Sequence, residues 1–147
     1  MGISSRDWHD VNEKKKRDIP RIFVYADSLS EDGILEGLRN GQVFVSSEPR
    51  VYFSAKYGDR KYEYGDETKI MGEKSINFQI QIENLKESSQ LQMIKNGLKF
   101  FNASLAKREN QRISFSDLSE ENSWYRCEIY TAGGNLLCFT NSVFLIS

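Results

Sequence analysis

The sequence predicts a mainly β protein, an immunoglobulin-like antiparallel β-sandwich preceded by a short strand-helix lead-in. From residue 42 onward, apolar and polar residues alternate with a period of two. Turn-forming residues separate these runs, and strand-favouring Val, Ile and aromatic residues are plentiful beside only two prolines. The pattern predicts six to eight short strands, which favours a sandwich over a barrel or a doubly wound fold.

The chain divides into three segments. Residues 1–20 are polar and have no sustained apolar period, which predicts a tail. Residues 21–48 form the lead-in, in which apolar runs at 22–25 and 43–45 predict two short strands around a helix. Residues 49–147 form the sandwich domain. The whole length of 147 residues suits a single hydrophobic core.

A helix is predicted between Ser30 and Gly41. Ser30 is a preferred N-cap, the next two residues are acidic, and Gly41 provides a C-terminal stop. Leu29 precedes the cap and is expected to contact Ile34 as a hydrophobic staple. Because so short a helix is marginal alone, we expect its apolar stripe to pack on the sandwich or on a second subunit. The stripe comprises Ile34, Leu35 and Leu38.

Later segments carry the signals of strands and hairpins. Residues 76–83 have one wholly apolar and one wholly polar face, which is typical of a half-buried antiparallel strand. Asn96 and Gly97 lie between two apolar runs and predict a tight hairpin. Residues 131–135 predict a second hairpin, and residues 143–146 a final strand. Residues 62–66 are expected to form a turn with partly exposed aromatics.

Composition excludes some classes of function. The formal net charge is −1, which argues against a nucleic-acid partner. No segment is apolar enough to span a bilayer and no signal-peptide core is present, so we expect no membrane partner and a cytoplasmic location. Cys127 and Cys138 lie in strand-like runs. A disulfide between them is conceivable if the strands pair, but we favour two buried thiols.

Few residues carry the signals of catalysis or metal binding. His9 is the single histidine, and the sequence holds no CxxC pair, phosphate-binding glycine loop or dinucleotide motif. Asp7 and His9 are spaced so that a strand would place them on one face, where they could share a metal. We interpret them as part of the tail; the alternative is a vestigial or shared metal pair.

A series of short motifs follows in a distinctive order along nearly the whole chain. They are Asp7-Trp8-His9, Val24-Tyr25-Ala26, Ile34-Leu35-Glu36-Gly37-Leu38-Arg39-Asn40-Gly41, Val43-Phe44-Val45-Ser46, Gly65-Asp66, Met93-Ile94-Lys95-Asn96-Gly97, Trp124-Tyr125-Arg126-Cys127-Glu128-Ile129 and Thr140-Asn141. This order resembles the C-terminal portion of PHP-superfamily (polymerase and histidinol phosphatase) metal-dependent hydrolases of the CehA/McbA-like branch.

The resemblance implies that residues 1–20 are a remnant of the end of a catalytic barrel, where Asp7 and His9 would be metal ligands. The other ligands of that family are an early H-x-H pair, a glutamate and further histidines, all absent from this chain. Two ligands do not seat a hydrolytic metal cluster. No enzyme activity and no cofactor are therefore expected of this chain alone. A divalent metal, Zn, Mn or Fe, would bind only if another chain supplied the rest of the site.

The sequence departs from that family at two further points. Arg6 stands where the family has serine before the metal-binding aspartate, and Ser142 stands where it has proline. A cation beside a cation site would weaken metal binding.

Tyr57, Tyr62 and Tyr64 form an aromatic cluster beside Lys56, Arg60 and Lys61. An ordinary loop is the preferred interpretation, and the alternative is a binding loop for carbohydrate or peptide.

Three functional hypotheses follow. The chain is a non-catalytic structural or interaction module, the C-terminal part of a PHP-like hydrolase that lost its barrel by cloning, gene splitting or evolution. Alternatively, it is an autonomous ligand-binding or protein-binding sandwich. In the third hypothesis it is one half of a split metallohydrolase, completed by a separate barrel chain. We also expect a homo-oligomer formed through the Ile34, Leu35 and Leu38 helix face.

Overall fold

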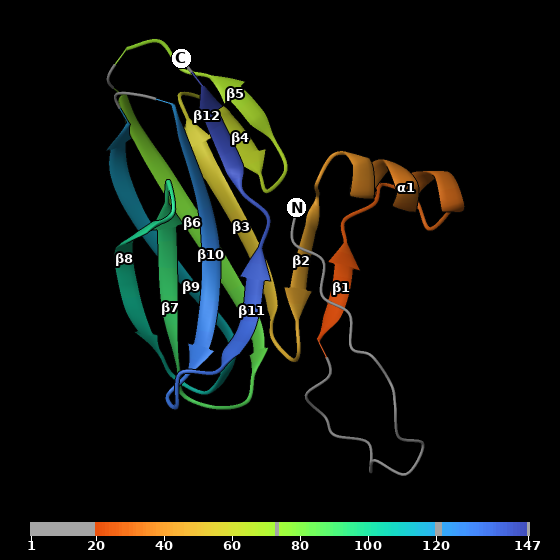
Figure 1. The fold of residues 1–147 in the computed structure, drawn as a ribbon, viewed down its shortest axis with the longest axis vertical. Coiled ribbons are helices and arrows are strands. Elements are labelled where there is room, and N and C mark those ends of the chain that lie inside the picture. Colours follow the sequence, from red (N-terminus) through yellow and green to blue (C-terminus); the bar gives the residue numbers. More distant parts are fainter. Residues whose placement is uncertain (1–19, 73, 120–121, 147) are drawn as a thin grey trace.

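The computed structural model describes residues 20–72, 74–119 and 122–146. Within these residues the chain forms two packed β-sheets and one short helix (Figure 1). The elements are β1 (Arg21–Val24), α1 (Glu31–Arg39), β2 (Val43–Ser46), β3 (Arg50–Tyr57), β4 (Arg60–Glu63), β5 (Glu67–Lys69), β6 (Lys74–Leu85), β7 (Ser89–Lys95), β8 (Leu98–Leu105), β9 (Arg108–Ser119), β10 (Ser123–Thr131), β11 (Leu136–Thr140) and β12 (Val143–Ile146). The predicted mainly β, sandwich-type fold is confirmed.

The two layers differ in size. Sheet B has four antiparallel strands in the order β4-β3-β6-β9. Sheet A has eight strands: the path β1-β2-β11-β10-β12-β5, with β7 paired to β10 and β8 paired to β7. Every pair in sheet A is antiparallel except β12 with β5, which is parallel. Because β2 pairs with β11, the predicted lead-in strands extend sheet A directly.

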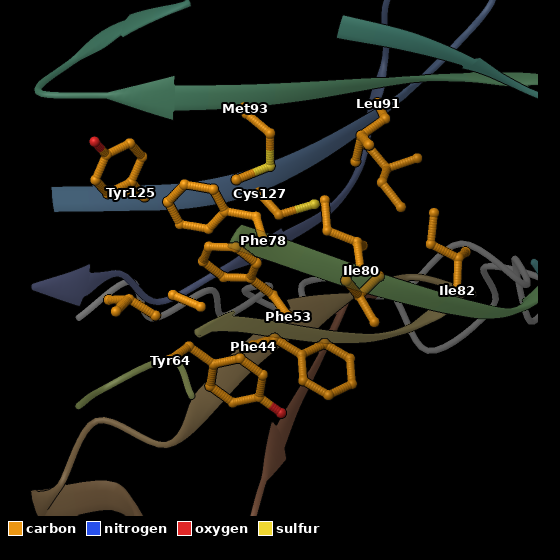
Figure 2. Packing of buried hydrophobic residues seen from close by; sticks show 14 of the residues in the cluster. Phe44, Phe53, Tyr64, Phe78, Ile80, Ile82, Leu91, Met93, Tyr125 and Cys127 are labelled. Atoms are coloured by element: carbon orange, nitrogen blue, oxygen red, sulfur yellow. The ribbon is translucent and has the colours of Figure 1, made fainter. Parts of the chain in front are cut away.

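The core lies between the sheets and follows the period-two alternation. In sheet B, Phe53 of β3 and Phe78 of β6 point inward and are almost fully buried. In sheet A, Tyr125, Cys127 and Met93 do the same, and Figure 2 shows these side chains from the two sheets packed together. Burying each large apolar side chain contributes about 1.5–3 kcal/mol. This layer is therefore the main source of stability.

Aromatic rings close the side of the sandwich where β8 crosses to β9. A bulge between Met93 and Ile94 shifts the β7–β8 register, so Phe100 and Phe101 both reach Phe115 of β9. The ring centroids lie 5.8 and 4.3 Å from that of Phe115. A regular strand would direct two consecutive side chains to opposite faces. The bulge thus lets both rings cover an otherwise open edge of the core.

Both predicted hairpins are confirmed. Asn96 and Gly97 have φ angles of 50° and 85°, which the tight turn between β7 and β8 requires. The second hairpin joins β10 and β11, where the Thr131 hydroxyl accepts a hydrogen bond of 3.0 Å from the Asn135 amide. Three strands escaped the sequence analysis, the long β9 and the short β4 and β5.

The predicted turn at residues 62–66 is present at Tyr64 and Gly65, where the Asp66 amide donates to the Glu63 carbonyl oxygen at 3.0 Å. The chain makes a further, unpredicted turn at Gly58 and Asp59, where Gly58 has a φ of +59° and Tyr57 pairs with Arg60 across the turn. The following residues can then pair with β3, and they form β4. The aromatics of this segment are consequently part of a strand or of the core.

The helix starts as predicted but packs differently. The Ser30 hydroxyl accepts a hydrogen bond of 3.1 Å from the Gly33 amide, as an N-cap does. The expected staple is wrong, because Leu29 is 100% exposed and the Ser28 and Ser30 hydroxyls lie 2.9 Å apart in its place. The helix packs instead through Gly37, where an added Cβ would lie 2.3 Å from the Tyr25 carbonyl oxygen.

The helix and the two strands beside it form an arm, which we define as residues 21–46. Figure 1 shows this arm at one side of the sandwich, with α1 directed away from the sheets. The ring of Phe44 stacks on that of Phe23 at 4.7 Å and meets the Tyr64 ring at 6.1 Å, which joins the arm to the core. In the described part of the chain, no helix has the length and apolar character needed to cross a membrane.

A kink in sheet A fastens the arm to the sandwich. β11 and β12 follow the same partner, β10, and are separated by Asn141 and Ser142. The Asn141 amide donates to the Val43 carbonyl oxygen at 3.0 Å, and its Nδ2 donates to the Gly41 carbonyl oxygen at 2.8 Å. The Gly65 amide donates to the Ser142 carbonyl oxygen at 2.7 Å. Three chain segments therefore meet at one point, which we call the junction.

The junction has no room for a side chain at Gly65. Its φ is +93°, and an added Cβ would lie 2.3 Å from the Asn40 carbonyl oxygen and 2.7 Å from the Gly41 carbonyl carbon. Both contacts are to backbone, which cannot rotate away.

Gly65→Ala is expected to lower the free energy of unfolding by about 3 kcal/mol or more, from the cost of positive φ together with overpacking. The matched control is Gly134→Ala. Gly134 also has a positive φ, +85°, but an added Cβ meets no atom within 4 Å, so a loss of only about 1–2 kcal/mol is expected. Urea unfolding followed by circular dichroism measures both. Equal losses in the two variants would contradict the described junction.

Candidate functional site

The outer face of sheet B is polar because the inner face takes the apolar residues. Tyr52 and Ser54 of β3 alternate with inward residues, as do Gln79 and Gln81 of β6. The strand register sets Tyr52 opposite Gln81 and Ser54 opposite Gln79. Glu63 of β4 lies opposite Ser54 on the other side. Side chains from three strands therefore gather on one surface.

A hollow of about 290 Å³ lies where this face meets the arm. Tyr25, directly after β1, forms part of its wall, and its amide donates to the Gln42 carbonyl oxygen at 2.8 Å. Tyr25 and Tyr52 are 48% and 41% exposed. The residues lining the hollow are Tyr25, Tyr52, Phe53, Ser54, Lys61, Glu63, Tyr64, Gln79, Gln81 and Glu83.

Tyr64 lies deepest among the tyrosines of this hollow. It is 4% exposed, and its ring meets that of Phe44 edge-on at 6.1 Å (Figure 2). Burial raises the pKa of the Tyr64 hydroxyl well above its usual range, and the nearby Glu63, Tyr52 and Tyr25 raise it further. The hydroxyl therefore stays protonated at neutral pH and keeps both its donor and its acceptor capacity.

Hydrogen bonds and an ion pair arrange the polar side chains of the hollow. Gln81 Nε2 donates to Glu83 Oε1 at 2.9 Å, and Arg112 Nη2 donates to Gln81 Oε1 at 3.3 Å. Lys61 Nζ donates to Glu63 Oε1 at 2.8 Å. Each carboxylate thus has a donor beside it. The exposed ion pair contributes little to stability, and its effect here is to set the direction of the two side chains.

A second hollow, of about 580 Å³, continues the first across the sheet. The two share Ser54, Lys61 and Gln79. Small side chains widen the second hollow, and the Ser116 hydroxyl of β9 donates to Asn77 Oδ1 at 2.7 Å within it. We call the two hollows together the polar groove.

The sequence-predicted tyrosines lie in different environments. The Tyr57 hydroxyl accepts a hydrogen bond of 3.1 Å from the Met71 amide. Tyr62 pairs with Ala55 and packs against the core. Of the three, only Tyr64 lines the polar groove. The expectation of partly exposed aromatics is therefore wrong for Tyr64, which follows β4 and is buried against Phe44. A binding role for Tyr57 and Tyr62 stays a prediction.

The main residues of the groove were not identified from sequence. The alternation over residues 76–83 already placed Gln81 on a polar outer face, but antiparallel sheets commonly have such a face. Tyr25 lies far from Gln81 in the sequence and reaches the groove only through the arm. No local sequence pattern predicts that Tyr25 lies beside sheet B.

The predicted metal pair, Asp7 and His9, lies outside the described residues. Among residues 20–72, 74–119 and 122–146, no group of three or more His, Cys, Asp or Glu side chains is arranged to hold a metal ion.

The two cysteines are free thiols within the core. They lie on adjacent strands, β10 and β11, and both point inward. Burial raises the pKa of Cys138 to about 12, although its hydrogen bond with Ser46 lowers it slightly. Burial also raises the pKa of Cys127 well above its usual range. Neither thiol forms the thiolate that a nucleophile needs at neutral pH.

Comparisons with known proteins show a likeness in structure alone. No protein-family model matches the chain, and no curated protein matches it. Two solved structures of the CARDB domain of a Pyrococcus furiosus protein are similar. One, determined by NMR, has a TM-score of 0.39 and 16% identity, and the match covers 67% of this chain and 96% of that chain. The other, a crystal structure in complex with di-metal ions, has a TM-score of 0.37, 17% identity and coverage of 68% and 96%.

These findings correct the sequence-based resemblance. The two solved structures described above are CARDB domains, and no family model or curated relative supports a PHP-superfamily hydrolase. The PHP relationship is wrong, and with it the interpretation of residues 1–20 as a barrel remnant loses its basis. The prediction of a β-sandwich domain does not depend on it and is confirmed.

The thiol environments can be tested by alkylation. Cys127 and Cys138 are expected to resist iodoacetamide in the native protein at neutral pH, because both are buried and protonated. In concentrated guanidinium chloride both should react. Mass spectrometry counts the adducts in each case. Rapid modification of either thiol in the native protein would contradict the described core.

Proposed function

We propose that this chain is a non-catalytic binding module that holds its ligand in the polar groove on sheet B. One observation carries the proposal. Tyr25 and Tyr52, from separate parts of the chain, leave about half of their surface exposed beside a hollow lined with amides and carboxylates. Ligand sites combine aromatic surface with a few directed polar groups in this way. A bound ligand would complete the burial of both rings.

The chemistry of the groove supports binding over catalysis. Its central ionisable residues, Lys61 and Glu63, are paired with each other and partly exposed. General acid-base or nucleophilic catalysis relies on groups whose pKa values the site has shifted toward the working pH. Tyr64 has a shifted pKa, but the shift holds its hydroxyl protonated at neutral pH. The groove therefore offers fixed hydrogen-bond donors and acceptors.

NMR titration of the ¹⁵N-labelled full chain tests this proposal. The probes are soluble neutral oligosaccharides, sulfated oligosaccharides, proline-rich peptides and acidic peptides. We expect at least one class to shift the backbone amides of Tyr25, Tyr52 and Gln81. Tyr52→Ala should then lower the affinity for that probe at least about tenfold, because an aromatic contact residue is lost.

Leu136→Ala is the control for this titration. Leu136 is an exposed apolar side chain at the start of β11 in sheet A, away from the groove. Its removal should leave the affinity of the probe unchanged. The proposal fails if no probe class binds, or if the shifted amides lie on sheet A.

A separate proposal concerns self-association through α1. Ile34 and Leu35 are each 38% exposed on the helix surface. The acidic residues Glu31 and Asp32 stand in the first turn and Arg39 in the last. A second copy packed antiparallel about a two-fold axis perpendicular to the helix would bring these opposite charges together and oppose the two helix dipoles.

Sedimentation equilibrium tests the self-association. The wild-type chain should show a concentration-dependent monomer–dimer equilibrium, and Leu35→Glu should shift it to monomer by placing charge in the contact. Glu36→Gln, a change at a neighbouring exposed position, should keep the dimer. A wild-type chain that is monomeric at every concentration would exclude this contact.

A further inference from the structure

The shape of the polar groove suits an extended ligand. The two hollows follow one another across β4, β3, β6 and β9 and share Ser54 and Gln79 in the middle. From Tyr52 to Lys56, at the two ends on β3, the backbone extends about 13 Å. Both volumes are of the order of small-ligand sites, about 300–1,000 Å³. A chain of several small units fits this surface better than one compact molecule.

The polar atoms in the groove offer donors and acceptors together. Gln79, Gln81 and Asn77 carry amides, each with two donor hydrogens and a carbonyl oxygen, and Ser54 and Ser114 carry hydroxyls. A ligand rich in hydroxyl groups, which also donate and accept, matches this set. A ligand with only acceptors, such as a phosphate or sulfate ester, would leave the acceptor oxygens unpaired.

Charge in and around the groove is balanced. Lys56, Lys61 and Arg112 stand against Asp59, Glu63 and Glu83. Positive and negative side chains alternate over the surface. Lys61 pairs with Glu63, and Gln81 bonds to both Arg112 and Glu83. Such a surface gives no net attraction to a polyanion or a polycation. The balance therefore favours a neutral ligand.

An extended peptide is a weaker match. Peptides that add to a sheet bind at an edge, where backbone groups are unpaired. The groove lies on the face of sheet B, where residues 50–56 of β3 pair with residues 77–83 of β6 and β6 also pairs with β9. Only side chains are available there. The apolar rings among the lining residues, Phe53, Phe78 and Phe115, pack in or against the core between the sheets.

From these observations, and resting on the function proposed above, we infer that the ligand of the polar groove is a neutral oligosaccharide. One sugar ring lies with its C–H face against Tyr52, beside Tyr25, since an aromatic face accepts an apolar surface edged by polar groups. The hydroxyl groups of this unit bond to Gln81 and to the Tyr64 hydroxyl. The next units run over Ser54 and Gln79 toward Asn77.

Isothermal titration calorimetry with the full chain tests this inference. The probes are neutral oligosaccharides of glucose, mannose, galactose and xylose, with a sulfated oligosaccharide and a proline-rich peptide for comparison. A neutral oligosaccharide should bind, and its affinity should change less than about twofold between low and high salt, because an uncharged ligand releases no counterions. Tyr52→Ala should weaken binding at least about tenfold.

A matched pair of glutamine variants separates the groove from the rest of the surface. Gln79→Ala removes an exposed strand glutamine within the groove and should weaken binding about threefold to tenfold, as the loss of one hydrogen bond does. Gln90→Ala removes an exposed strand glutamine of sheet A and should leave the affinity unchanged. Equal unfolding midpoints of the two variants show that neither result comes from misfolding.

The outcomes distinguish this inference from the function on which it rests. Binding of the peptide or the sulfated probe in the groove, with no neutral probe bound, overturns the saccharide inference and leaves the binding module standing. If no probe reaches the groove, both fail. Neutral binding that survives Tyr52→Ala and Gln79→Ala also overturns the inference, because the ligand would lie elsewhere.

Discussion

The rest of the structure depends on the junction at which Asn141, Gly41 and Gly65 meet. There sheet A kinks between β11 and β12, and the side chain of Asn141 takes the place of the interrupted strand pairing by bonding to the Gly41 carbonyl oxygen. The kink leaves the Cys127 amide without a strand partner, and the Thr140 hydroxyl accepts its hydrogen bond at 3.0 Å. Buried backbone groups must be paired, and at the kink these two side chains supply the hydrogen bonds that strand pairing would otherwise make. The kink in turn holds the arm beside β3 and β4.

The arm matters because it converts a plain sheet face into a groove. Sheet B alone would present a nearly flat polar surface, of the kind found on many antiparallel sheets. The arm adds Tyr25 at one end, near the buried Tyr64. The close packing of Gly37 on the Tyr25 backbone fixes this position from the helix side. The close packing at Gly37 therefore helps to form the groove, although the arm and sheet B are distant in the sequence.

The sequence predicted the strands better than the surface they create. Alternation at residues 76–83 and the Asn96-Gly97 turn report directly on local backbone and burial, so β6 and the β7–β8 hairpin were found. The turn at Gly58 was missed because the tyrosines after it looked like loop residues, although they face the core. The groove depends on a contact between the arm and sheet B, and no period within either segment encodes it. Most of the motifs that suggested a PHP hydrolase are strand and turn motifs, and unrelated sandwiches need the same alternation and the same turn residues.

The central claim is that Tyr25 of the arm and Tyr52 of sheet B together hold a neutral sugar chain. A crystal structure of the full chain grown with the neutral oligosaccharide that binds best tests it most directly. The account predicts electron density for a sugar ring against Tyr52, with further units extending over Ser54 and Gln79. Density for the sugar on sheet A or at the surface of α1, with the groove holding only water, would contradict it.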